Sequence, residues 1–166
     1  MPANNISSLY LEKHHHTAIF LGSGESINEI TPDQWKIIGK FTTFAVNNFH
    51  YHPFVPTYYM VEVKARDREF WKRVQDRRTD YKNVRWIISR RKNVSSLLPI
   101  DSIMYFYDMV KLTDERVECP DYILNTDITT NTLTCACGIS MTLLFELWYK
   151  MGYQRIILLG TDLYNS

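Results

Sequence analysis

The feature that most restricts the fold is a series of short apolar runs in which neighbouring residues, rather than alternate ones, are hydrophobic. Such runs are typical of strands in a sheet covered on both faces. Amphipathic segments of helical length separate several of them, and alternating strands and helices indicate a parallel sheet. We therefore expect an α/β fold with a Rossmann-like, doubly wound, mostly parallel sheet flanked by helices. The predicted strands are residues 17–21, 41–46, 58–63, 84–89, 103–107 and 156–159.

Helical patterns cover residues 32–40, 65–78 and 139–151. Thr31 and Pro32 suit the N-cap and first turn of the first helix. The third helix repeats apolar side chains every four residues and ends at Gly152. Residues 111–134 show no regular pattern, so we expect a long loop there.

Length and composition narrow the class of protein. The 166 residues suit one domain, and 45% hydrophobic residues allow a buried core, which excludes intrinsic disorder. A net charge of +1 gives no reason to expect a nucleic-acid partner. Cys119, Cys135 and Cys137 cannot all pair and are interpreted as reduced thiols. No apolar run is long enough for a membrane span and no secretory signal is visible, so we expect a cytoplasmic location.

The sharpest motif is a glycine-containing turn, Gly22-Ser23-Gly24-Glu25-Ser26, directly after the first predicted strand. Gly22 allows a tight turn, and Gly24 lets a ligand approach the backbone. Exposed N–H groups in the turn favour a phosphate, so Gly24→Val should weaken nucleotide binding far more than it lowers stability. The alternative is an ordinary strand–turn–helix connection that needs glycine only for its geometry.

Two features argue against NAD as the nucleotide. Ile27 stands where the dinucleotide fingerprint has its third glycine, and the second predicted strand ends at Asn47-Asn48 instead of an acidic residue. An amide at Asn47 favours another nucleotide. The last predicted strand leads through Gly160 to Asp162, whose carboxylate suits ribose hydroxyls, a metal or a base, unless it only caps a turn.

Three blocks, with their order and spacing, carry a resemblance to a known family. They are Gly-Ser-Gly-Glu-Ser-Ile-Asn-Glu-Ile from residue 22, Phe-Ala-Val-Asn-Asn-Phe from residue 44, and Met-Gly-Tyr-Gln-Arg-Ile-Ile-Leu-Leu-Gly-Thr-Asp-Leu-Tyr from residue 151. The chain resembles bacterial sialyltransferases of the Campylobacter lipooligosaccharide type, glycosyltransferase family 42. It is also similar to the wider superfamily that includes proteins resembling the archaeal 6-hydroxymethylpterin diphosphokinase.

The resemblance implies a domain that binds a CMP-sugar donor, without metal or other cofactor, for transfer to a glycan or lipooligosaccharide acceptor. The family's catalytic histidine lies beyond the last matching block. We therefore assign no catalytic residue and expect residues 1–166 to be a single nucleotide-binding domain, the N-terminal part of a longer protein, that transfers no sugar by itself. The implied nucleotide-binding residues are Gly22, Ser23, Gly24, Ser26, Asn47, Gly138, Ser140, Gly160, Asp162 and Tyr164.

Other interpretations stay open. A diphosphokinase-like enzyme would bind ATP with Mg²⁺ held by carboxylates such as Asp162, and a nucleotide-binding remnant would have no activity. His50 and His52 are the first histidines to consider as a base, whereas residues 14–16, all histidine, indicate a solvated start rather than a metal site. Residues 64–92 hold twelve Lys/Arg against four Asp/Glu. This segment suits a solvated helix face, an anionic acceptor glycan or a phosphorylated lipid head group in peripheral membrane contact, and less well nucleic acid, which we do not expect as a partner.

Overall fold

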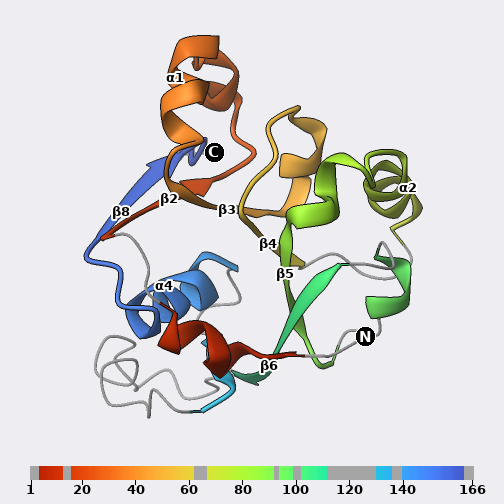
Figure 1. The fold of residues 1–166 in the computed structure, drawn as a ribbon, viewed down its shortest axis with the longest axis vertical. Helices are drawn as coiled ribbons and strands as arrows, with labels where there is room; N and C mark the ends of the chain where they lie inside the picture. Colours follow the sequence, from red (N-terminus) through yellow and green to blue (C-terminus); the bar gives the residue numbers. More distant parts are fainter. Residues whose placement is uncertain are drawn as a thin grey trace.

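An eight-stranded parallel sheet organises the chain (Figure 1). The computed structural model describes residues 4–12, 16–61, 67–91, 94–98, 102–111, 130–135 and 140–162. Neighbouring strands follow the order β1-β6-β5-β4-β3-β2-β8, with β7 paired to β6, and every described pairing is parallel. The strands are β1 (Asn4–Asn5), β2 (Thr17–Leu21), β3 (Thr42–Val46), β4 (Tyr58–Val61), β5 (Arg85–Ser89), β6 (Ile103–Lys111), β7 (Thr132–Cys135) and β8 (Arg155–Leu159).

Helices cover both faces of this sheet, which confirms the predicted α/β class. In Figure 1, α1 and α2 lie above the sheet, and α4 lies below it. The α-helices are α1 (Pro32–Ile38), α2 (Arg68–Asp76) and α4 (Ser140–Lys150). Short 3₁₀ helices connect them: η1 (Ile6–Leu11), η2 (Glu25–Glu29), η3 (Asn47–Tyr51), η4 (Asp80–Asn83) and η5 (Ser95–Leu97).

Burial on both faces explains the consecutive apolar residues of the strands. In β2, Ala18 and Phe20 pack with η1 and α4, whereas Ile19 and Leu21 pack with the face that carries α1 and α2. All four side chains are buried. Each of the two cores therefore takes every second residue of the same strand.

The first helix begins as its sequence predicts. The backbone N–H of Gln34 donates to the Thr31 hydroxyl (3.4 Å), and the Gln34 side chain accepts from the Thr31 N–H (2.8 Å). Pro32 occupies the first turn. This reciprocal pair satisfies two N–H groups that would otherwise lack a partner at the helix start.

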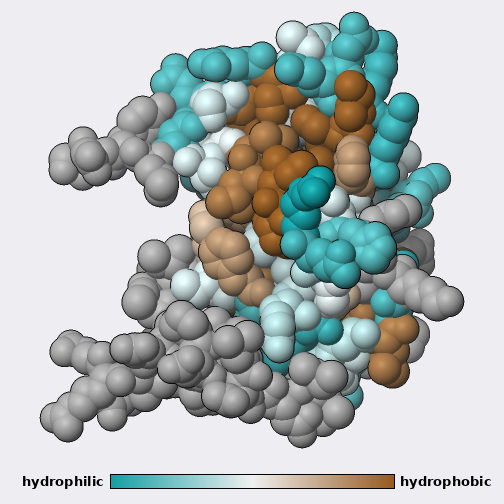
Figure 2. Space-filling model, turned by 90° about the vertical axis from the view of Figure 1, so that its left-hand side faces the viewer, coloured by the Kyte–Doolittle hydropathy of each residue, from teal (hydrophilic) through white to brown (hydrophobic). Residues whose placement is uncertain are grey.

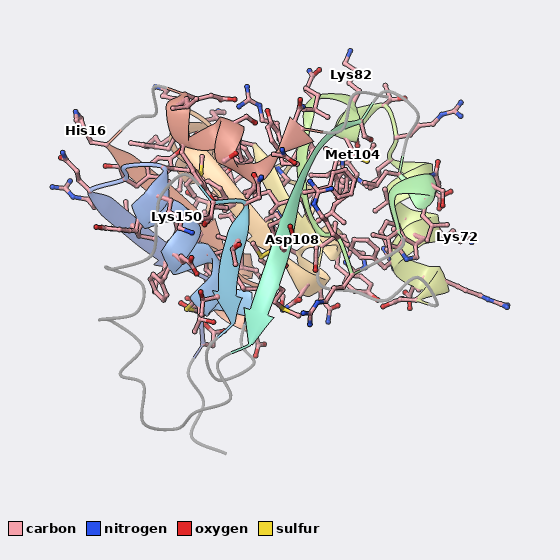
Figure 3. The ribbon with its side chains drawn as sticks, turned by 90° about the horizontal axis from the view of Figure 1, so that it is seen from below. His16, Lys72, Lys82, Met104, Asp108 and Lys150 are labelled. Carbon is pink, nitrogen blue, oxygen red and sulfur yellow. The ribbon has the colours of Figure 1, made fainter. Side chains whose placement is uncertain are left out.

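The structure departs from the predicted loop at residues 111–134. Strand β6 continues to Lys111, and residues 132–135 pair with it as β7, so part of the expected loop belongs to the sheet. The pairing of β7 is stabilised by α4, in which Glu146 and Lys150 form a fully buried ion pair of 2.7 Å. Lys150, labelled in Figure 3, donates to the Thr132 carbonyl (2.7 Å), and Glu146 accepts the N–H of Thr134. Both members of the ion pair therefore also form hydrogen bonds to the backbone of β7 and fix this strand against α4.

Strand β8 lies at an edge of the described sheet, because its pairing there is with β2 alone. Its side chains Ile157 and Leu158 remain 38% and 40% exposed. An apolar groove of about 390 Å³ runs between β8 and α1, where Ile37 and Phe41 contribute to its lining. Figure 2 looks onto this side, and hydrophobic residues gather in its centre. Among the described residues, no helix is both long and apolar enough to cross a bilayer.

Candidate functional site

The carboxyl ends of β2, β3 and β8 meet at a topological switch point. Strand β2 pairs with β3 on one side and with β8 on the other. The connection from β2 to β3 passes through α1 on one face, whereas α4, which leads into β8, covers the opposite face. In open α/β sheets, ligands bind at such a point, outside the carboxyl ends of the strands.

The glycine turn after β2 packs directly against the turn after β8. The Gly22 N–H donates to the Leu159 carbonyl and the Gly24 N–H to the Gly160 carbonyl, both at 2.8 Å. A Cβ on residue 22 would lie 2.2 Å from the Gly160 oxygen. Gly160 itself has a φ of +64°, a backbone conformation that favours glycine. The glycines therefore permit two loops to approach each other.

Asp162 completes this contact between the two loops. Its carboxylate accepts the Ser26 N–H (2.9 Å) and the Ser26 hydroxyl, and its Cγ would lie 2.6 Å from a Cβ on residue 24. The sequence predicted that Gly24 makes room for a ligand. The structure instead places Asp162 and the Gly160 carbonyl there, so the close approach at Gly24 is to the protein itself. A direct ligand contact by these residues stays a prediction.

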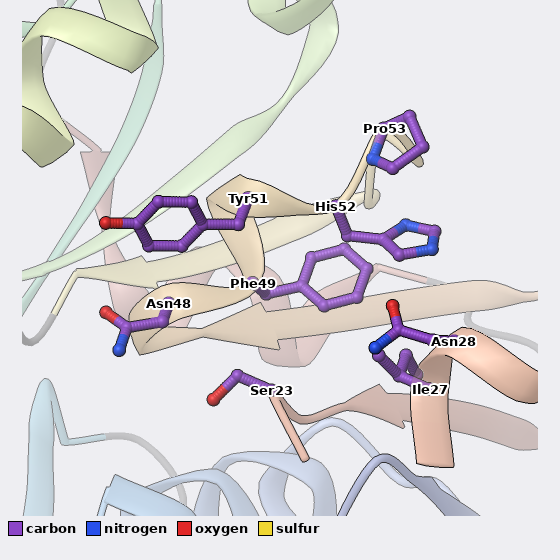
Figure 4. A pocket seen from close by; sticks show the side chains of 8 residues that line it. All are labelled: Ser23, Ile27, Asn28, Asn48, Phe49, Tyr51, His52 and Pro53. Atoms are coloured by element: carbon purple, nitrogen blue, oxygen red, sulfur yellow. The ribbon is translucent and has the colours of Figure 1, made fainter. Parts of the chain in front are cut away.

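A pocket of about 210 Å³ opens beside this pair of loops (Figure 4). Ser23 and Asn48 lie on one side of the view, and Asn28 and His52 lie on the other. Of the polar lining residues, Ser23 was predicted from the sequence, whereas Asn28 and Asn48 were not assigned to a site. In the sequence, only their neighbours pointed to them: Asn28 lies in the first matching block, and Asn48 directly follows Asn47. The lining residues are Ser23, Ile27, Asn28, Asn48, Phe49, Tyr51, His52 and Pro53.

Aromatic rings fix the wall of the pocket that carries His52. Trp35 stacks on Phe54, and its ring centroid lies 4.5 Å from that of His52. The His52 Nδ1 accepts the N–H of Phe54 (3.0 Å), so the neutral ring carries its proton on Nε2. Arg77 donates to the His52 carbonyl (2.8 Å). His52 therefore offers a neutral N–H donor rather than a free base nitrogen at Nδ1.

His50 differs from His52 in its surroundings. Its side chain is only 3% exposed, and it packs against Tyr51 and the edge of Phe70. It does not line the described pocket. Of the two histidines considered as a base, the structure thus sets His52 alone against the pocket. Asn47 precedes them with a φ of +50°.

Lowering the pH from 7 to 5 is expected to lower the melting temperature, in part through these histidines. Burial lowers the pKa of His50 and His52, and Arg77 lowers that of His52 further. The unfolded chain therefore takes up protons first as the pH falls below the usual histidine pKa of about 6.5. The two histidines therefore contribute their full stabilisation above about pH 6.5. This stabilisation is lost as the pH falls towards their pKa values in the folded protein.

Thermal melts between pH 7 and pH 5 measure this effect. The double variant His50→Gln/His52→Gln should show a flatter dependence of melting temperature on pH than the parent. The single variant His16→Gln is the control for the substitution itself, because it makes the same chemical change at an exposed position. Equal slopes for the parent and the double variant would contradict the prediction.

The structure describes the remaining predicted site residues only in part. Gly138 and Tyr164 are outside the described residues, and Ser140 is placed only as the first residue of α4. Because α4 leads into the amino end of β8, its start lies at the same edge of the sheet as the pocket. No cluster of three metal-ligating side chains occurs within the described ranges.

Part of the positive charge in residues 64–92 is used within the protein. Arg77 donates to the backbone carbonyls of His52 and Pro53, and Arg85 pairs with Glu12 at 2.5 Å. Arg73 lies over the Tyr51 ring at the pocket (4.2 Å) and contacts Glu69 at 3.4 Å. Arg73 and Arg77 thus contact the segment that carries Tyr51 and His52, whereas Arg85 pairs with Glu12 at the amino ends of the strands.

No protein-family model matches the chain, and no curated protein or solved structure was found that resembles it.

Proposed function

We propose that this chain is the nucleotide-binding domain of a sialyltransferase-like glycosyltransferase, with a CMP-sugar as donor and a glycan as acceptor. The observation that supports this most is the pocket at the carboxyl ends of β2 and β3, beside the switch point, which neutral polar side chains and aromatic rings line together. The three sequence blocks that carry the family resemblance contribute the turns around it. The resemblance and the geometry thus point to the same edge of the sheet.

The charges around the pocket favour a nucleoside monophosphate over a triphosphate. None of its eight described lining residues is Lys or Arg. The Asp162 carboxylate already accepts the N–H of Ser26, and its negative charge would repel a phosphate next to Ser26. A phosphate is therefore expected on the Ser23 side, bound by neutral donors. A triphosphate would need several cationic partners, and none of the described side chains that line the pocket is cationic.

Asp162 and Asn47 are assigned to the nucleoside. A carboxylate has about four acceptor positions on two oxygens, so the contacts with Ser26 are compatible with ribose hydroxyls as further donors. Asn47 follows β3 at the same edge and offers an amide. The start of α4 at Ser140 is assigned to the pyrimidine, as the resemblance implies. In the transfer, an acceptor hydroxyl would attack the anomeric carbon as CMP leaves, and no base is assigned among the described residues.

We expect CMP and CDP to bind better than ATP or NAD, without a requirement for Mg²⁺. Losing a hydrogen bond that leaves buried groups unpaired costs about 1–3 kcal/mol. Asn47→Ala and Asp162→Ala should therefore each weaken CMP binding roughly ten- to a hundredfold. Calorimetric titration and thermal shift with a panel of nucleotides measure this.

Two exposed positions away from the pocket supply matched controls. Asn83→Ala and Asp33→Ala make the same chemical changes in η4 and α1, and both should bind CMP as the parent does. A preference for ATP with Mg²⁺ would favour the diphosphokinase-like alternative. If no nucleotide binds, the proposed function is rejected.

A further inference from the structure

Asn47 adopts a backbone conformation that the chain must hold in place. Its φ of +50° is the only positive value at a non-glycine residue within the described ranges. Asparagine tolerates this left-handed region better than most residues, yet the conformation is still less favourable than the common ones. Such a residue persists when its surroundings determine it, and it is found most often at functional sites.

Two buried side chains contact the carbonyl of Asn47. The Tyr59 hydroxyl donates to this oxygen at 2.6 Å and accepts the His50 backbone N–H at 3.0 Å. The His50 Nδ1 lies 3.2 Å from the same oxygen. A carbonyl only accepts, so Nδ1 carries the proton in this contact. The carbonyl is thereby held towards the interior by two donors.

Packing and register fix the position of the Tyr59 hydroxyl. Tyr59 on β4 pairs with Ala45 on β3, two residues before Asn47. Its ring is fully buried and stacks on Trp86, with the ring centroids 5.3 Å apart. The hydroxyl therefore reaches the end of β3 from a rigid core, rather than from a loop that would follow the turn.

We propose that Tyr59 and His50 are positioning residues for the nucleotide site. Their contacts with the Asn47 carbonyl fix Asn47 in the left-handed conformation and keep its amide side chain at the carboxyl edge of the sheet. The role of that amide rests on the proposed function, whereas the conformation of the turn is a property of the chain itself. The two parts can therefore be tested separately.

The conformation is tested by melting Asn47→Gly and Asn47→Ala, each with Tyr59 intact and with Tyr59→Phe. With Tyr59 intact, the glycine variant should melt about 2–4 °C above the alanine variant, because only glycine accepts this φ without strain. Without the hydroxyl the turn relaxes, and the difference should fall below about 1 °C. Tyr58→Phe is the matched control: its hydroxyl accepts from Arg85 on the other face of β4, so the full difference should remain. If the glycine and alanine variants of Asn47 differ in melting temperature as much with Tyr59→Phe as with Tyr59 intact, the proposal is overturned.

CMP titration tests the role in binding. Tyr59→Phe should weaken CMP binding about tenfold in the parent, the effect of one lost hydrogen bond. It should have no further effect when Asn47 is already alanine, since Tyr59 acts through Asn47. Independent, additive losses would overturn the positioning role. If the parent binds no CMP, the proposed function fails, and the melting comparison alone decides whether Tyr59 holds the turn.

Discussion

Glu146→Gln is expected to lower the free energy of unfolding by roughly 3–5 kcal/mol, because it leaves the ammonium of Lys150 buried without its counter-ion. The Glu146–Lys150 pair is fully buried, and each member also contacts the backbone of β7. Glutamine keeps the shape and an acceptor oxygen, so the loss reports the missing charge. For a chain of this size the melting temperature should fall by about 10 °C.

A matched pair on α2 supplies the control for this prediction. Glu69 and Arg73 have the same spacing of four residues, but their side chains are 61% and 43% exposed. Exposed pairs of this kind contribute about 0.3–0.5 kcal/mol, so Glu69→Gln should barely change the melting temperature. Adding Lys150→Met to Glu146→Gln removes the unpaired charge and should recover much of the loss. Equal melting of Glu146→Gln and Glu69→Gln would contradict the assignment of a buried pair.

Gly22→Ala is expected to be the second large effect, with a loss towards the upper end of about 1–3 kcal/mol. The new Cβ would lie 2.2 Å from the Gly160 oxygen and 2.9 Å from its carbonyl carbon. Both are backbone atoms of the turn after β8, so neither can move without shifting that turn. Denaturant unfolding measures the loss of stability, and CMP titration should show that binding falls with it.

Two other glycines calibrate this prediction. At Gly24 the nearest atoms belong to the Asp162 side chain, although the Gly160 oxygen lies at 2.8 Å, so Gly24→Ala should cost less than Gly22→Ala. The Gly24→Val expectation from the sequence therefore changes: stability and binding should both fall. At Gly39 the nearest atom is 3.4 Å away and φ is −62°, so alanine should be neutral or stabilising by about 0.4–1 kcal/mol. Similar unfolding of the Gly22 and Gly39 variants would contradict the packing of the two turns.

Local patterns were enough to place most of the fold. The strand predicted at residues 84–89 is observed as Arg85–Ser89, and the helix predicted at 139–151 as Ser140–Lys150. The strand shows as a short run of consecutive apolar residues and the helix as apolar residues repeated every four positions, and both patterns are visible without tertiary contacts. The start of α1 was equally predictable, because an N-cap acts within a few residues.

Elements that depend on distant partners were missed. Helix η1 buries Ile6 and Leu9 completely, but six residues are too few for their period to stand out. Strand β7 has only four residues and owes its place to β6 and to the buried ion pair of α4. Neither partner can be read from the local sequence. The residues of β7 were therefore assigned mostly to a loop, and no element was predicted at η1.

The sequence predicted where the candidate site residues lie in the sheet, but not their contacts. The sequence placed Gly22, Gly160 and Asp162 at one edge, because strands of a parallel sheet end there together. It could not show that Asp162 accepts from Ser26, since that contact joins residues 136 apart. Nor could it show that a tyrosine from β4 contacts the Asn47 carbonyl. Such contacts follow from tertiary packing rather than from any motif.

The pairing of β2 with β8 also has a consequence for the order in which the chain folds during synthesis. A ribosome adds about 5–20 residues per second, so roughly 7 to 27 seconds separate the emergence of Ser26 from that of Asp162. Until then, the growing chain can form the β2–β3–β4–β5 pairings, but the β8 side of β2 has no neighbour. An unpaired strand edge readily joins another chain. The candidate site is thus completed only after β8 has been synthesised, and until then the unpaired edge of β2 needs protection from other chains.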